Sequence, residues 1–198
     1  VSVFSGDDGL KIGVDKEAID HWSRHLDTSQ ILKFGKKENF WEMGDTGPCG
    51  PCSEIHFDLR SDEDREKLDG AGLVNADHPE VIEIWNLVFM QYNRLETGEL
   101  VNLKSRHIDT GMGLERLARV LQNAKSNYDV DLFRNLIVRV EELSGIKYLG
   151  GESLRDIAFR VIADHVRAVV FCIADGQLPS NVGAGYVIRR VLRRAIRY

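Results

Sequence analysis

The chain has 198 residues, of which 43% are hydrophobic and 29% charged, a mixture typical of globular proteins. No apolar stretch approaches the roughly 18 residues of a membrane span, and the start lacks the order of a signal peptide, so we expect no membrane partner. The three cysteines argue against a disulfide framework and favour the reducing cytoplasm. The first residue is not Met, and we expect an internal piece of a longer protein.

The charge is unevenly distributed along the chain. The net charge is −5, yet residues 155–198 hold eight Arg against three Asp. Any contact with a polyanion is therefore expected at the C-terminal end.

The first half of the chain has the pattern of strands. Residues 1–4 suggest a strand, and residues 15–26 carry apolar side chains at the spacing of one helix face. A Gly/Pro/Cys-rich loop is expected at 44–51, a strand at 54–59 and a solvated insertion with a possible helical turn at 60–78. Residues 80–93 are apolar on both faces, which predicts a central strand, followed by a turn at 95–98 and short strands at 99–103 and 106–109.

From Leu114 onward the apolar period is helical. Helices are predicted at residues 114–122, 130–143, 154–174 and 186–198. Ser153 and Asp156 have the spacing of a capping box, and Gly176 suits a helix end. Strands followed by helices predict an α+β fold, with an antiparallel sheet and flanking helices in residues 1–125 and an all-helical segment in residues 126–198. The boundary is expected at 123–129.

The segment 109–116 could bind a nucleotide. It places an acid at a strand end, two glycines in a turn and an arginine on the first turn of a helix. Glycine allows close approach of a ligand, a helix N-terminus attracts phosphate, and guanidinium can stack on a base. Spacing alone favours a strand–turn–helix with a glycine bend and a surface arginine over a nucleotide site.

Four long segments resemble one family, in the same order along the chain. Residues 107–122 (HIDTGMGLERLARVLQ) resemble the motif 3 region of alanyl-tRNA synthetases, which are class II aminoacyl-tRNA synthetases. Residues 39–58, 83–94 and 160–198 match the same family, so the resemblance covers almost the whole chain apart from residues 60–78. It implies the family's reaction, in which alanine and ATP, with Mg²⁺ as part of the substrate complex, form alanyl-adenylate before transfer to tRNA(Ala).

The resemblance also implies roles for individual residues. Asp109 would hold the α-ammonium of alanine, Trp41 and Val88 would enclose its methyl group, and Gly111 and Gly113 would admit the substrate backbone and adenine. Arg116 would bind ATP. Without the resemblance, Trp41 and Val88 would be interpreted as core residues, and that alternative remains open. Asn86 is a further candidate for the pocket, because it is a polar residue between apolar neighbours and its burial needs a hydrogen bond. No acid–base pair is expected, because the reaction depends on positioning and charge neutralisation.

Cys49 and Cys52 have the C-x-x-C spacing of a redox pair, but without the strand and helix of a thioredoxin-like site. As half of a zinc site with His56 they lack a second pair, and Cys172 is distant in sequence, so zinc is not expected here. We interpret them as part of a shaped wall beside the substrate. Glu54 and His56 could support the site, and His165 is interpreted as a structural histidine on an apolar stripe.

The last helix is expected to contact RNA. It contains no acidic residue, and five arginines share one face about 6 Å apart along the axis, namely Arg189, Arg190, Arg193, Arg194 and Arg197. Such contacts supply affinity and salt dependence. By resemblance, Asn181 would contact the acceptor stem of tRNA(Ala). The chain has Val182 and Ala184 where the family often has Glu and Arg, which puts contacts by those two side chains in doubt.

Two hypotheses follow. In the first, the chain is part of an alanine–tRNA ligase; in the second, it is an RNA-binding module without catalysis. Only the first requires Asp109 and Arg116 to share a site with Trp41 and Val88. Motifs 1 and 2 of class II synthetases are not found, so we expect the isolated 198 residues to have little or no alanine activation.

Overall fold

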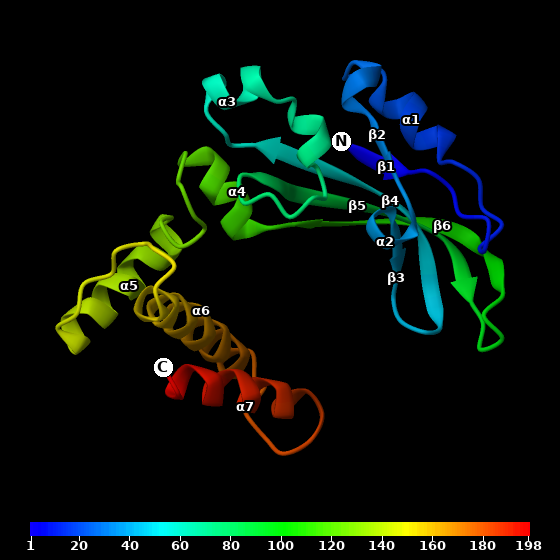
Figure 1. Cartoon of the computed structure of the whole chain (residues 1–198). Coiled ribbons are helices and arrows are strands. Elements are labelled where there is room, and N and C mark those ends of the chain that lie inside the picture. Colours follow the sequence, from blue (N-terminus) through cyan, green and yellow to red (C-terminus); the bar gives the residue numbers. More distant parts are fainter. The chain divides into compact units, whose positions relative to one another are not determined.

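The computed structural model describes residues 1–198, which form two compact units, Val1–Asn123 and Ala124–Tyr198 (Figure 1). The division falls within the predicted break at 123–129. Each unit has its own elements and is described by itself.

The first unit is built on a six-stranded sheet. Five of its strands follow the order β2-β1-β4-β5-β6, and the sixth, β3, pairs with β4. Only β1 and β2 run parallel; the other pairs are antiparallel. The strands are β1 (Ser2–Phe4), β2 (Leu32–Phe34), β3 (Phe40–Glu42), β4 (Gly47–Asp58), β5 (Val81–Arg94) and β6 (Leu100–Met112). The expected α+β class, with a mostly antiparallel sheet, is confirmed.

β5 matches the predicted central strand within one residue at each end. It pairs with β4 on one side and β6 on the other, so it is an interior strand of the sheet. The predicted turn at 95–98 is also present, because Leu95 N–H donates to the Glu99 carbonyl and Gly98 N–H to the Leu95 carbonyl.

The loop predicted at residues 44–51 is wrong for its second half, which forms the first part of β4. Glycine and proline are typical of loops, but here β3 and β5 pair with the segment from either side. Gly50 makes this possible: a Cβ at that position would lie 2.0 Å from the carbonyl oxygen of Phe89. The glycine therefore serves close strand approach rather than a turn.

The two short strands predicted at 99–103 and 106–109 are one strand, β6. Its register against β5 shifts between Met90 and Tyr92, which face His107 and Asn102. The bulge accommodates a polar stretch that breaks the alternating pattern in the sequence.

Short helices surround the sheet. Asp15 caps α1 (Lys16–Trp22) by accepting the Ala18 N–H at 3.0 Å, and the helix ends at Trp22 rather than continuing to residue 26. The insertion at 60–78 contains α3 (Asp62–Lys67) and η2 (Gly70–Leu73), more helix than the single turn considered. The remaining elements of this unit are η1 (Thr28–Gln30), α2 (Lys36–Asn39) and α4 (Leu114–Leu121).

The second unit contains α5 (Asp131–Ser144), α6 (Leu154–Ala174) and α7 (Gly183–Ile196). α6 has its predicted bounds, and Ser153 caps it by accepting the Asp156 N–H. Gly176, with φ +87°, follows its end as predicted. None of the helices of the chain is long and apolar enough to cross a membrane.

The α7 helix buries small residues on one side and leaves large apolar side chains exposed. Gly185 and Ala195 are buried, but Val187 is 60% and Ile196 73% exposed. A Cβ on Gly185 would lie 2.6 Å from the Leu178 carbonyl oxygen, so the start of α7 packs closely against the loop that precedes it.

Candidate functional site

Strand register brings four of the predicted alanine-site residues together. Val88 on β5 lies directly opposite Asp109 on β6, and Asn86 lies opposite Gly111. On the other side of β5, Cys52 and Glu54 of β4 face the same two residues. Directly opposite residues project to the same face of a sheet. Two rows of three residues therefore cross one face, which we call the Asp109 face. The first row is Cys52, Val88 and Asp109, and the second is Glu54, Asn86 and Gly111.

The Asp109 face offers polar groups to a ligand. Asn86 Oδ1 is buried and has no hydrogen-bond partner. The Asp109 carboxylate is exposed, accepts the Thr110 N–H at 2.9 Å, and forms no ion pair within the chain. A Cβ on Gly111 would meet nothing within 4 Å, so the space above this residue is open. A carboxylate and an amide oxygen beside open space suit a small cationic group.

A buried hydrogen-bond network lies beside Asn86. The Glu54 carboxylate, only 7% exposed, accepts the Ser2 hydroxyl at 2.9 Å and the Asn75 amide at 3.3 Å, and pairs with His56 at 3.1 Å. Burial acts to raise the pKa of Glu54, but the hydrogen bonds from His56, Ser2 and Asn75 outweigh it and hold that pKa below its usual value. Glu54 is therefore a charged, rigid support for the sheet at this point.

Arg116 lies on α4 and is held by Glu83 of β5. Its Nη1 donates to the Glu83 carbonyl at 2.9 Å and to Glu83 Oε2 at 3.0 Å. Gly113, the N-cap of α4, packs against the Arg116 side chain, since a Cβ there would lie 3.2 Å from Arg116 Cδ. The structure thus relates Gly113 to the placement of Arg116.

Sequence reasoning missed Glu83, because simple alternation assigns it to the face opposite Asn86. The register against β4 shifts there: Trp85 faces Ile55, but Glu83 faces His56, so Ile84 is an extra residue. His56 and Glu54 share a face, and the bulge therefore turns Glu83 to the Asp109 face. The charge of Glu83 contributes to raising the pKa of Cys52, as expected for neighbours. No spacing rule could have indicated this bulge.

Trp41 reaches the same side of the sheet from β3. It is half-buried and pairs with Gly50, which lies two residues before Cys52 on β4, so strand alternation places it on the side of the Asp109 face. Val88 is 7% exposed and belongs both to the core and to the Asp109 face. The wall of Trp41 and Val88 stays a prediction.

Cys49 and Cys52 are free thiols, 0% and 2% exposed, on a β-strand. Burial, with the charge of Glu54, raises the pKa of Cys52 to about 12. Redox cysteines have a low pKa and are accessible, so this pair has the properties of structural thiols. The chain contains no group of three or more His, Cys, Asp or Glu side chains placed to hold a metal ion.

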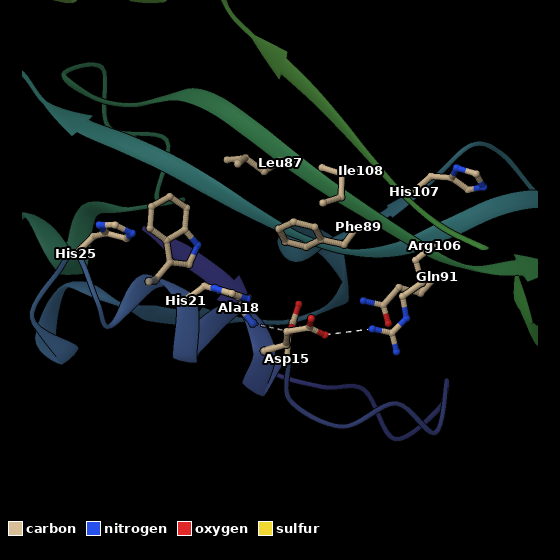
Figure 2. Close-up of a pocket in the computed structure, with 12 residues that line it drawn as sticks. Asp15, Ala18, His21, His25, Leu87, Phe89, Gln91, Arg106, His107 and Ile108 are labelled. Carbon is tan, nitrogen blue, oxygen red and sulfur yellow. Dashed lines mark hydrogen bonds and ion pairs between the residues drawn. The ribbon is translucent and has the colours of Figure 1, made fainter. Parts of the chain in front are cut away.

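A cavity of about 350 Å³ lies on the opposite face of the sheet, between α1 and strands β5 and β6 (Figure 2). Leu87, Phe89 and Ile108 form its apolar side, and the Glu17–Arg106 ion pair crosses its edge at 3.1 Å. None of the predicted alanine or ATP residues lines it. The alternation of β5 explains this separation, because Leu87 and Phe89 project away from Asn86 and Val88.

The basic residues of α7 surround a hollow of about 520 Å³ in the second unit, lined by His165 of α6 and by Arg190, Arg193, Arg194 and Arg197. Arg189 is turned aside and donates to Asn181 Oδ1. His165, whose side chain is 16% exposed, pairs with Asp164 at 2.8 Å and also lines this hollow; its interpretation as a structural histidine stays a prediction.

Comparison with known proteins identifies the family of the chain. The profile of the family described as "tRNA synthetases class II (A)" matches residues 1–198. The whole chain is 62% identical to an alanine–tRNA ligase of Christiangramia forsetii and 57% identical to one of Cytophaga hutchinsonii, and covers 23% and 22% of those proteins. The chain therefore spans less than a quarter of the length of these relatives. On the full-length profile match and this identity, the chain belongs to the class II (A) tRNA synthetase family.

Proposed function

We propose that the full-length protein containing this chain is an alanine–tRNA ligase, which activates alanine with ATP and transfers the alanyl group to tRNA(Ala). The relatives that cover the whole chain carry this name. The three free thiols suit a reducing cytoplasm as its location. Residues 1–125 would be part of the aminoacylation domain and residues 126–198 the start of a tRNA-recognition domain.

One observation carries the amino-acid site: the register that puts the Asp109 carboxylate and the unpartnered Asn86 Oδ1 on one face, with open space at Gly111. An α-ammonium group has three donors and needs acceptors of this kind. Val88, beside Asp109, would contact the methyl group of alanine, and Trp41 of β3 would form a second wall of the pocket.

ATP would bind toward α4. Arg116 Nε and Nη2 have no partner in the chain and can donate to phosphate or stack on adenine. Mg²⁺ would arrive with ATP as part of the substrate. The chain's contribution to the chemistry is to orient alanine and neutralise charge, so that the carboxylate attacks the α-phosphate in line.

tRNA would bind to the second unit. The four arginines around the hollow are suited to backbone phosphates, and Asn181, beside them in contact with Arg189, is the candidate for the acceptor stem. Catalysis-free RNA binding remains the competing function, and it makes no use of the Asp109 face.

The test is Asp109→Asn in the full-length protein. Asparagine keeps the size but removes the charge, and a charge-assisted hydrogen bond contributes about 1.5–3 kcal/mol. We expect alanine-dependent pyrophosphate exchange with a KM for alanine raised about 10- to 150-fold, and a KM for ATP that changes little. If the unsubstituted full-length protein binds RNA but shows no alanine-dependent pyrophosphate exchange, the proposal is refuted in favour of RNA binding without catalysis.

A further inference from the structure

We propose that Glu83 is a positioning residue, which holds Arg116 in the conformation that receives ATP. This inference rests on the proposed function, because it requires Arg116 to contact ATP. The Arg116 side chain is 47% exposed and Glu83 is 32% exposed, so the pair lies at an accessible edge of the Asp109 face.

The geometry restrains Arg116 from two sides. Nη1 is fixed by two acceptors of the same residue, the Glu83 carbonyl at 2.9 Å and Oε2 at 3.0 Å. On the other side the stem of Arg116 packs against Gly113, whose N–H donates to the Ile84 carbonyl at 3.0 Å. The start of α4 and the bulge of β5 are thereby joined, and both determine where the guanidinium points.

The contact occupies only one nitrogen of the guanidinium. Nε and Nη2 keep their donors, so ATP can bind without breaking the contact with Glu83. An ion pair this exposed contributes little to stability, and a positional role explains it better. Without the carboxylate, only the Glu83 main-chain carbonyl would hold the guanidinium, which could then rotate about a single hydrogen bond.

Two effects of the carboxylate oppose each other. Holding an arginine ready removes an ordering cost on binding of about 0.5–1.5 kcal/mol, equivalent to about 2- to 12-fold in affinity. The negative charge also repels the phosphates of ATP. Positioning predicts that loss of Glu83 weakens ATP binding, whereas dominant repulsion predicts that it strengthens binding.

The experiment uses pyrophosphate exchange by the full-length protein, with ATP and alanine varied separately. We expect Glu83→Ala to raise the KM for ATP about 3- to 10-fold and to leave the KM for alanine within twofold. Glu83→Gln, which keeps an acceptor, should give a smaller rise. Glu17→Ala is the matched control, since it removes the exposed Glu17–Arg106 pair of the opposite face and should leave both constants unchanged.

A double-mutant cycle separates this inference from the proposed function. Arg116→Ala should raise the KM for ATP, and adding Glu83→Ala to it should have no further effect, because the residue acts through Arg116. An unchanged or lower KM for ATP in Glu83→Ala, with a raised one in Arg116→Ala, overturns the positioning role and leaves the ATP role of Arg116 intact. If Arg116→Ala leaves the KM for ATP unchanged, both the positioning role of Glu83 and the ATP role of Arg116 are overturned.

Discussion

Replacing Gly50 with alanine should break the pairing on which the Asp109 face depends. Gly50 lies on β4 between β3 and β5, and a Cβ there would sit 2.0 Å from the Phe89 carbonyl oxygen and 3.0 Å from the Gln91 nitrogen. Cβ atoms essentially never approach heavy atoms closer than 3.0 Å, so β4 and β5 must separate by about 1 Å. The obstacle is backbone, which has no alternative rotamer.

The magnitude follows from two contributions. Forcing an extra carbon into a packed site costs about 1–3 kcal/mol. Weakening a strand hydrogen bond at the same point costs about 1 kcal/mol. We expect the free energy of unfolding to fall by about 2–4 kcal/mol, which lowers the Tm of a unit of this size by roughly 8–15 °C.

Tryptophan fluorescence is a suitable assay, because all three tryptophans lie in the first unit, at positions 22, 41 and 85. Thermal unfolding followed by fluorescence therefore reports this unit without interference from the helical one. Gly72→Ala is the control, since a Cβ there meets nothing within 4 Å. If Gly50→Ala unfolds within about 2 °C of that control, the close approach of β4 and β5 is not as described.

Three further outcomes are expected. Gly111→Ala should leave stability nearly unchanged, because its Cβ would enter open space, but it should raise the KM for alanine severalfold in the full-length protein if the substrate occupies that space. In thiol labelling at pH 8, Cys172 should react well before Cys52, because a pKa of about 12 keeps the Cys52 thiol neutral. The same pKa predicts that the free energy of unfolding falls as the pH rises from 9 to 12, since the Cys52 thiol ionises near pH 9 in the unfolded chain but not in the folded one. Arg190→Ala should weaken tRNA binding by the full-length protein and reduce the slope of log K against log salt by about one, and an unchanged slope would exclude a phosphate contact.

Asp109, Val88, Asn86 and Gly111 show how far a sequence can lead. Their membership of one site came from resemblance to a family, but the period of two along β5 already placed Asn86 and Val88 on the same face. The helices of the second unit followed from apolar spacing and capping, both of which are local. Trp41 marks the limit, because the register that places it at Gly50 depends on how β3 returns along β4.

What the sequence determined by itself is the class of fold, the central strand, the bounds of α6 and the family. Tertiary structure alone decided the continuity of β4 and β6 and the partner of Arg116. The reason is physical: propensity and periodicity describe a residue's neighbours along the chain, whereas a bulge at Ile84 or a strand passing within contact of Gly50 depends on segments far away in sequence. Sequence pointed to the Asp109–Arg116 segment as the proposed site, whereas the bulge in a different strand places the Glu83 carboxylate that its arginine contacts.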